Sequence, residues 1–266
     1  QGGGAGPLAG IALAHKDMFY RAGQVSNCGS KIRRGWVASE TSTALERLDA
    51  AGALQIGTLN MSEFAYGPTG HNDHWGDCCN PWNTDYITGG SSSGAGAAVA
   101  ARLVFGALGS DTGGSVRIPA AMCGTVGLKP TYGLVSRYGV TPYSFTFDHC
   151  GPLTWTVEDC AIMLGAIAGY DARDSGSVDR PAADYRTALS PDIRGMRVGV
   201  VRHFWEQDLK ANEQLARAME EALDVLRRLG AKVEDARMRP LQDYVDVKMV
   251  IAETESTARE QLAKAA

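Results

Sequence analysis

The sequence of 266 residues contains few cysteines, and none of them is arranged in a pattern that usually indicates a structural role. There are six cysteines, and no two form a Cys-x-x-Cys pair. A disulfide framework or a structural zinc site therefore has little support. This cysteine usage predicts a reducing compartment, the cytoplasm.

Long apolar runs and blocks of like charge are also missing. The longest weakly polar run, residues 95–108, is interrupted by Arg102 and is too short to cross a bilayer, so we expect no membrane contact. Lys and Arg number 26 against 30 for Asp and Glu. Because phosphate binding needs a positively charged surface, this balance argues against direct contact with nucleic acid.

Glycine, in contrast, is abundant, with 32 copies that are densest between residues 89 and 114. Strands predicted at 7–14, 54–58 and 104–108 alternate with helices predicted at 44–51 and 97–103, which indicates an α/β layer architecture. The first strand ends at His15-Lys16-Asp17. Polar side chains at a strand end are a common position for functional groups.

Other segments give further expectations about local structure. Thr43 and Glu46 predict a capping box at the start of the first helix. Residues 64–86, rich in Gly, Asn, Asp, Trp and Pro, predict a long ordered loop. Later elements are predicted as a helix at 156–168, a strand at 196–201, a helix whose buried stripe runs from Leu215 to Leu229, and a strand at 232–236.

Several kinds of site can be weighed from residue types alone. Gly94-Ala95-Gly96 lacks the third glycine of a dinucleotide fingerprint, and no P-loop follows, so we expect no cofactor. A metal could be bound by His71 and His74 with Asp73 and the adjacent Cys78 and Cys79, but an ordinary polar loop is the better interpretation and we expect no metal. Asp148 and His149 offer an alternative triad with a serine.

Three motifs together resemble the amidase signature family. They are Gly89-Gly90-Ser91-Ser92-Ser93-Gly94, the segment 109–120 beginning Gly-Ser-Asp-Thr-Gly-Gly-Ser, and the upstream segment 10–17 ending His-Lys-Asp. The resemblance implies a three-layer α/β/α fold with a mixed central sheet. It also implies a catalytic core at 1–190 that residues 191–266 continue as the same domain. Members of the family are longer, so the fold is expected to be incomplete at both ends, with a C-terminal part missing.

The same resemblance implies a Ser-cisSer-Lys catalytic triad. Ser115 would be the nucleophile, Ser91 the bridging serine on a cis peptide bond after Gly90, and Lys16 the terminal base. General chemistry agrees, because a serine hydroxyl needs an adjacent base and a lysine acts as one only when neutral. Burial favours that neutral state.

The turn before Ser115 is expected to bind the oxyanion of the tetrahedral intermediate through backbone N–H groups. The predicted donors are Thr112, Gly113 and Gly114, and the two glycines let the backbone curl around one oxygen because they have no Cβ. Supporting roles are expected for three further residues, namely Ser92, Asp111 and Arg117.

The predicted function is amidohydrolysis, in which a carboxamide is cleaved through an acyl-enzyme with release of ammonia or an amine. One alternative is the glutamine-hydrolysing A subunit of a tRNA-dependent amidotransferase, which the segment 131–139 also resembles. Another is a non-catalytic binding protein that retains the amidase fold. The expected partners are a small-molecule amide substrate and either a second copy of the chain or amidotransferase subunits.

Overall fold

The computed structural model describes residues 6–190 and 192–265, and its contacts divide the chain into two compact units. The first comprises Gln1–Arg186 and Glu255–Ala266, and the second comprises Thr187–Thr254. This division lies close to the boundary expected at residue 190. That residues 191–266 continue the same domain stays a prediction.

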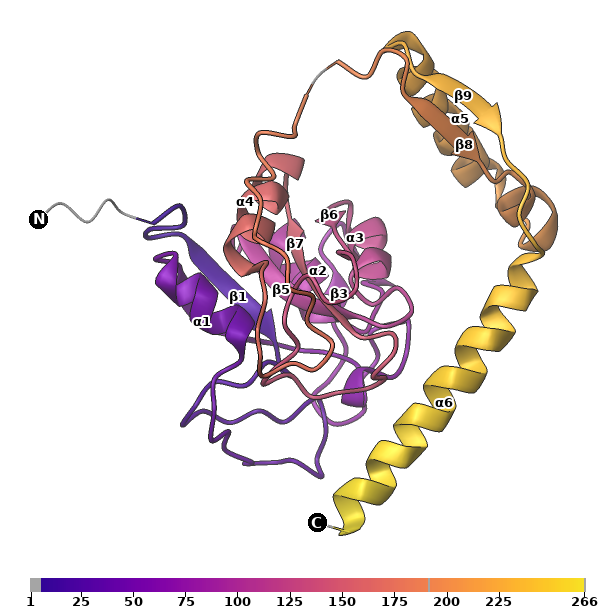
Figure 1. Ribbon diagram of the computed structural model, residues 1–266. Helices are drawn as coiled ribbons and strands as arrows, with labels where there is room; N and C mark the ends of the chain where they lie inside the picture. The colour runs from indigo at the N-terminus through magenta and orange to yellow at the C-terminus, as the bar shows by residue number, and fades with distance from the viewer. Residues whose placement is uncertain (1–5, 191, 266) are drawn as a thin grey trace, which may run out of the picture. The chain divides into compact units, whose positions relative to one another are not determined.

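A mixed sheet of five strands forms the centre of the first unit (Figure 1). The strand order is β2-β1-β5-β7-β6, in which β2, β1 and β5 run parallel and β7 runs antiparallel to β5 and β6. Three strands correspond to predicted ones, whereas β6 and β7 have no counterpart among the predictions. The strands are β1 (Ala12–Lys16), β2 (Leu54–Leu59), β5 (Gly106–Asp111), β6 (Val126–Gly127) and β7 (His149–Thr154).

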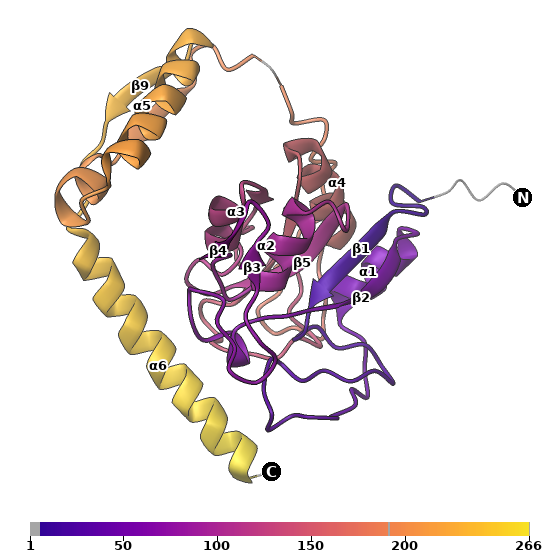
Figure 2. The same ribbon diagram turned by 180° about the vertical axis from the view of Figure 1, so that it is seen from behind.

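Helices cover both faces of this sheet (Figures 1 and 2). Leu13 and Leu108 join the apolar cluster under α1 and α4, while their neighbours Ala14 and Ala107 join the cluster under α2 and α3. Successive strand residues point to opposite faces, so β1 and β5 supply both clusters. The three-layer α/β/α fold is therefore confirmed. The helices are α1 (Thr43–Ala50), α2 (Ser93–Ala100), α3 (Arg117–Cys123) and α4 (Val157–Ile167).

Small residues let α2 lie close to its neighbours. A Cβ atom added to Gly96 would lie 2.9 Å from the Cβ of Pro119 in α3 and 3.1 Å from its carbonyl oxygen. A Cβ added to Gly94 would lie 2.7 Å from the backbone nitrogen of Asn60. This close packing holds the N-terminus of α2, with its serines, against the ends of the central strands.

The predicted capping box at Thr43 and Glu46 is wrong. Helix α1 follows Ser42, whose side chain makes no capping hydrogen bond. The Thr43 hydroxyl instead donates to the carboxylate of Asp171, and Glu46 forms an ion pair with Arg173 at 2.7 Å. The side chains of Thr43 and Glu46 thus contact residues distant in the sequence instead of capping the helix.

The segment predicted as a loop at 64–86 contains regular structure. A short 3-10 helix, η1 (Glu63–Ala65), is followed by an antiparallel hairpin of β3 (Cys79–Asn80) and β4 (Asn83–Ile87). Strand β4 is exposed over most of its length. A strand without a buried face needs no alternation of apolar and polar residues, which is why the sequence gives no signal for it.

The second unit contains the predicted strand, helix and strand. Strands β8 (Arg197–Val200) and β9 (Lys232–Asp235) pair in parallel, and α5 (Glu213–Arg228) connects them after the short π-helix η2 (Phe204–Asp208). Helix α6 (Leu241–Ala265), whose residues up to Thr254 belong to this unit, has no counterpart among the predictions.

The stripe predicted to be buried along α5 is only partly buried. Leu223 is buried, but Leu215 is 52% exposed and Leu229 is 49% exposed. The sheet of this unit has only two strands, and it leaves part of the apolar face of α5 uncovered. The spacing of the apolar residues correctly predicted a helix. Burial of its apolar face would need a larger sheet than the two strands of this unit provide.

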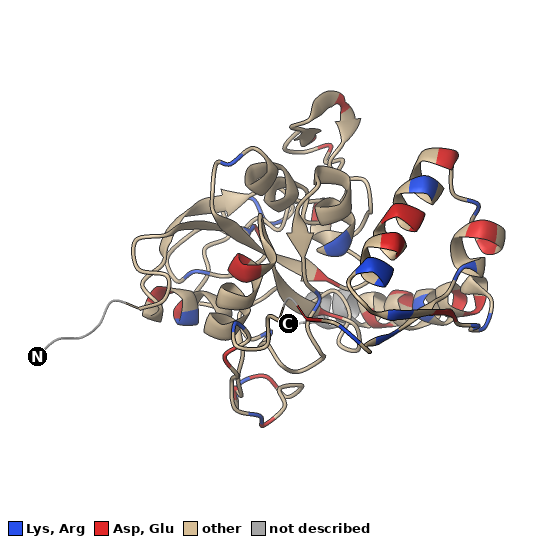
Figure 3. Cartoon of the chain, turned by 90° about the horizontal axis from the view of Figure 1, so that it is seen from above, with Lys and Arg blue, Asp and Glu red and all other residues tan. Residues whose placement is uncertain are grey.

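Among residues 6–190 and 192–265, no helix has the length and apolar character needed to cross a bilayer. The 25-residue helix α6 is the longest candidate by length, and it carries acidic and basic residues along its sequence. Figure 3 shows Lys and Arg interspersed with Asp and Glu rather than gathered by sign.

Candidate active site

Lys16 is the last residue of β1 and is completely buried. Its Nζ atom donates hydrogen bonds to Ser91 Oγ at 2.7 Å and to Ser110 Oγ at 2.8 Å. Burial lowers the pKa of Lys16 to about 7, although the nearby Asp148 and Asp111 favour the charged form. The amine is therefore available in its neutral state near neutral pH.

Ser91 lies just before α2 and is also completely buried. The Gly90–Ser91 peptide bond is cis, as the sequence analysis expects. The Ser91 carbonyl accepts a hydrogen bond from the Ser62 amide at 3.1 Å, which ties this segment to the stretch after β2. The Ser91 hydroxyl is thereby held facing the end of β1.

Ser92 connects the Ser91 segment to the turn that carries Ser115. Its backbone N–H donates to the Ser115 carbonyl at 3.2 Å, and its hydroxyl donates to the Ser110 carbonyl at 3.3 Å. The structure thus brings Lys16, Ser91 and the Ser115 turn together from three separate parts of the sequence. The supporting position expected for Ser92 fits these contacts.

Asp111, at the end of β5, anchors the Ser115 turn. Its buried carboxylate accepts from the backbone N–H groups of Gly114 at 2.8 Å and Val116 at 3.1 Å. It also accepts two hydrogen bonds from the Arg117 guanidinium, at 2.8 and 2.9 Å. Burial alone would raise the pKa of Asp111, but the Arg117 contacts and these amides hold it below its usual range.

The half-buried Ser115 follows the glycine turn, and its side chain makes no hydrogen bond to Ser91 within the described part of the chain. Catalytic hydrogen bonds are often long or poorly aligned outside the reacting complex. The link between the two hydroxyls, and hence the complete triad, stays a prediction.

The backbone donors expected for the oxyanion differ in their availability. The Gly114 amide is occupied by Asp111. Over the described residues, the amides of Thr112, Gly113 and Ser115 have no acceptor. The geometry therefore favours these three amides, rather than that of Gly114, as groups that could face an oxyanion.

The alternative triad through Asp148 and His149 finds no support in the geometry. The Asp148 carboxylate accepts from the Thr112 hydroxyl and from the amides of Tyr143 and Ser144, and it makes no hydrogen bond to His149. His149 Nδ1 donates to the Phe147 carbonyl at 2.6 Å. The His149 ring is therefore held by a backbone carbonyl two residues before it and not by a carboxylate.

The residues weighed as metal ligands have ordinary partners. His74 Nε2 lies 2.9 Å from a Glu63 oxygen, and His71 lies 3.9 Å from Asp77. Within the ranges that the structure describes, no group of three or more His, Cys, Asp or Glu side chains is placed to hold a metal ion.

Ser110 and Met18 are the residues that sequence reasoning missed. Ser110 accepts from Lys16, and its own hydroxyl donates to the Met18 sulfur at 3.0 Å. A hydroxyl residue near the end of β5, next to the strand that ends in Lys16, is the signal that could have indicated Ser110. Nothing in the sequence pattern points to Met18.

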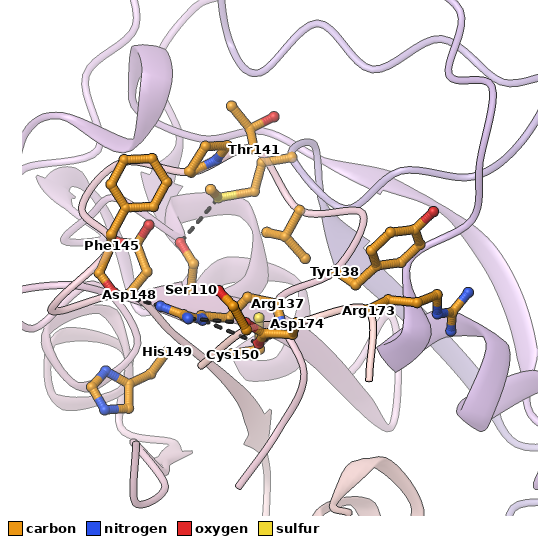
Figure 4. A pocket seen from close by; sticks show the side chains of 14 residues that line it. Ser110, Arg137, Tyr138, Thr141, Phe145, Asp148, His149, Cys150, Arg173 and Asp174 are labelled. Atoms are coloured by element: carbon orange, nitrogen blue, oxygen red, sulfur yellow. Dashed lines mark hydrogen bonds and ion pairs between the residues drawn. The ribbon is translucent and has the colours of Figure 1, made fainter. Parts of the chain in front are cut away.

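A pocket of about 230 Å³ borders Ser110 and Met18 (Figure 4). Arg137, Asp148 and Asp174 also line it. Arg137 and Asp174 form an ion pair at 3.0 Å, so the two opposite charges largely compensate each other. The lining of this pocket is more apolar than polar, and the pocket adjoins the lysine and serine cluster through Ser110, which contacts Lys16.

Comparisons with known proteins agree with this geometry. The Amidase family model matches residues 2–265. The A subunit of the Glutamyl-tRNA(Gln) amidotransferase of Pelobacter propionicus is 48% identical over 257 residues, which cover 96% of this chain and 52% of that protein.

Two solved structures have the same fold. A crystal structure of the A subunit of Glutamyl-tRNA(Gln) amidotransferase from Thermotoga maritima superposes with a TM-score of 0.90 at 38% identity, covering 95% of this chain and 56% of that one. Native peptide amidase from Stenotrophomonas maltophilia gives a TM-score of 0.88 at 35% identity, covering 96% and 53% respectively.

The chain thus combines a three-layer α/β/α fold with a buried cluster in which Lys16 contacts Ser91 and Ser110. The chain belongs to the amidase family. It spans about half the length of the relatives that it matches.

Proposed function

We propose that this chain carries the catalytic centre of an amidohydrolase that cleaves a carboxamide C–N bond through a serine acyl-enzyme. The observation that carries the proposal is the contact of 2.7 Å between the buried Lys16 amine and the Ser91 hydroxyl. A lysine held in this way can be neutral near pH 7 and can accept a proton.

In the proposed reaction the Ser115 oxygen attacks the amide carbon. Its proton passes to Ser91, and the Ser91 proton passes to Lys16. The developing oxyanion is stabilised by the backbone N–H groups of Thr112 and Gly113, together with that of Ser115. The predicted donor Gly114 is left out of this set because its N–H already donates to Asp111.

Collapse of the tetrahedral intermediate breaks the C–N bond. The proton held by Lys16 returns through Ser91 to the leaving nitrogen, and ammonia or an amine departs. Water then attacks the acyl-enzyme by the same proton path and releases the carboxylate. Ser92, Asp111 and Arg117 support the two serine segments and exchange no proton.

A fluorophosphonate probe tests the proposal, because such probes react with activated serine hydroxyls. We expect the probe to label Ser115, as mapped by peptide mass spectrometry, and to leave a Ser115→Ala variant unlabelled. Equal labelling of the wild-type chain and the variant would contradict the assignment. No labelling of a folded wild-type chain would favour the non-catalytic binding protein.

The second candidate function is that of an amidotransferase A subunit, which hydrolyses glutamine and passes ammonia to a partner. The identity of 48% to a protein of that name favours it. Partner subunits that co-purify with the chain, with ammonia release from glutamine that depends on them, would establish this function. Hydrolysis of simple amides without a partner would favour an independent amidase.

A further inference from the structure

The Lys16 amine is the centre of a buried chain of hydrogen bonds that extends beyond the predicted triad. From Ser91 the contacts run through Lys16 to Ser110 Oγ and on to Met18 Sδ. All four side chains are at most 3% exposed. Ser110 and Met18, which lie beyond Lys16 in this chain of contacts, have no role in the proposed reaction described above.

The direction of each hydrogen bond follows from what its groups can donate. A neutral amine has one lone pair and two N–H donors, whereas a hydroxyl can either donate or accept. A thioether sulfur only accepts. The Ser110 hydrogen therefore points to Met18, and a lone pair of Ser110 Oγ is left to accept from Lys16.

This direction decides where the lone pair of the lysine lies. Protonated Lys16 donates to Ser91. In the neutral amine, if Ser110 accepts an N–H from Lys16, the lone pair is free to accept a proton from Ser91. If Ser110 instead donated to Lys16, its hydrogen would occupy the same lone pair and compete with Ser91. We propose that Met18 and Ser110 are positioning residues that direct the Lys16 lone pair toward Ser91, an inference that rests on the proposed function.

The charged and titratable groups around Lys16 do not supply this orientation. They are Asp111 at the end of β5, Asp148 and Cys150 at the start of β7, and Cys28 in the stretch after β1. Both carboxylates are occupied, Asp111 by the Ser115 turn and Asp148 by Thr112 and two amides. None of these four groups hydrogen-bonds to Lys16 Nζ over the described residues.

Met18→Leu tests the proposal, because leucine has a similar volume and no acceptor. The matched control is Met163→Leu, which changes an equally buried methionine in α4. Two measurements are made on the full chain of each variant. One is the pH titration of Lys16 by NMR of lysine labelled with carbon-13 at Cε, and the other is the rate at which a fluorophosphonate labels Ser115.

In Met18→Leu we expect the Lys16 titration to move to lower pH. Protonated Lys16 would still require Ser110 to accept, which would leave the Ser110 hydrogen unpaired, whereas neutral Lys16 could take that hydrogen. The labelling rate at high pH should fall about fivefold, the effect of one competing hydrogen bond. Met163→Leu should change neither quantity.

A double variant separates orientation from packing. Met18 acts through the Ser110 hydroxyl, so in a Ser110→Ala background the Met18→Leu change should have no further effect on the Lys16 titration or on labelling. An unshifted or upward-shifted titration in Met18→Leu would overturn the proposal, as would an equal effect of Met18→Leu in both backgrounds. Absence of labelling in the wild-type chain would contradict the proposed function instead, while the titrations would still decide the role of Met18.

Discussion

At the scale of single residues, burial has different effects on two polar side chains of the candidate site, Lys16 and Asp111. Lys16 is buried without a carboxylate partner, which is costly for a charged amine and therefore favours the neutral one. Asp111 is equally buried but is surrounded by donors, so it stays charged and acts as a structural anchor. Burial thus favours the neutral form of Lys16, whereas Asp111 stays charged because donors surround it.

The lowered pKa of Lys16, about 7, predicts the pH dependence of Ser115 reactivity. Below that pH the neutral fraction of Lys16 falls about tenfold per pH unit, so the labelling rate should fall with it. Above that pH the rate should level off. Measuring the labelling rate between pH 5 and 9 checks this prediction, because a range of about four pH units includes both the rise in rate and the plateau. A rate independent of pH across the range would rule out Lys16 as the base.

The same group affects stability in a defined direction. A lysine titrates near 10.5 when exposed in the unfolded chain and at about 7 in the folded one. Between these two pH values the unfolded chain holds more protons, so the contribution of Lys16 to folding stability rises with pH across this window. A Lys16→Met variant should lack this contribution in denaturant unfolding at pH 7 and pH 9.

Arg117→Gln tests the brace at Asp111. The substitution removes a bidentate partner from a fully buried carboxylate, so the pKa of Asp111 should rise. The free energy of unfolding should fall by about 1–3 kcal/mol. Urea unfolding of the variant beside the wild-type chain measures the change. The account of Asp111 fails if stability is unaltered and the variant labels at Ser115 as fast as wild type.

At the scale of elements, the position of the site depends on how closely α2 and α3 approach each other. Both helices follow glycine-rich turns that carry a serine of the site, Ser91 before α2 and Ser115 before α3. Gly96 is a point of close approach, because a Cβ there would meet Pro119. The separation of the two serines is therefore set partly by a residue that takes no part in the chemistry.

Gly96→Ala should push α2 and α3 apart. We expect a loss of about 1–3 kcal/mol in the free energy of unfolding from overpacking, together with slower labelling of Ser115. Gly57→Ala in the edge strand β2 is the control, because its added Cβ would have no atom within 4 Å. Thermal and urea unfolding of both variants give the comparison. Equal stability of the two variants would show that the helix contact does not limit the site.

At the scale of the whole molecule, the buried central strands were predicted better from the sequence than the exposed elements. The strands near 7–14 and 104–108 are apolar and lie at the centre of the sheet, so their pattern reflects their environment. Two of the predicted site residues, Lys16 and Ser91, lie within hydrogen-bond distance of each other. Exposed strand β4 and the partly exposed face of α5 did not follow the patterns expected of buried elements.

Other features depended on contacts between distant residues and could not be read locally. The Thr43 hydroxyl is paired with Asp171 instead of capping α1, and the Gly114 amide already donates to Asp111. Met18 is an ordinary core methionine by type, and only its distance to Ser110 gives it the proposed role in orienting Lys16. The structure adds the direction of each side chain, which residue type alone does not give.

The chain spans about half the length of its relatives, and the site described above lies within its first unit. The central claim is that a proton leaves Ser115 by way of Ser91 to Lys16. The rate of fluorophosphonate labelling of Ser115 in a Ser91→Ala variant tests it most directly. The account predicts a fall of at least about 100-fold at pH 8, and labelling as fast as in the wild-type chain would contradict it.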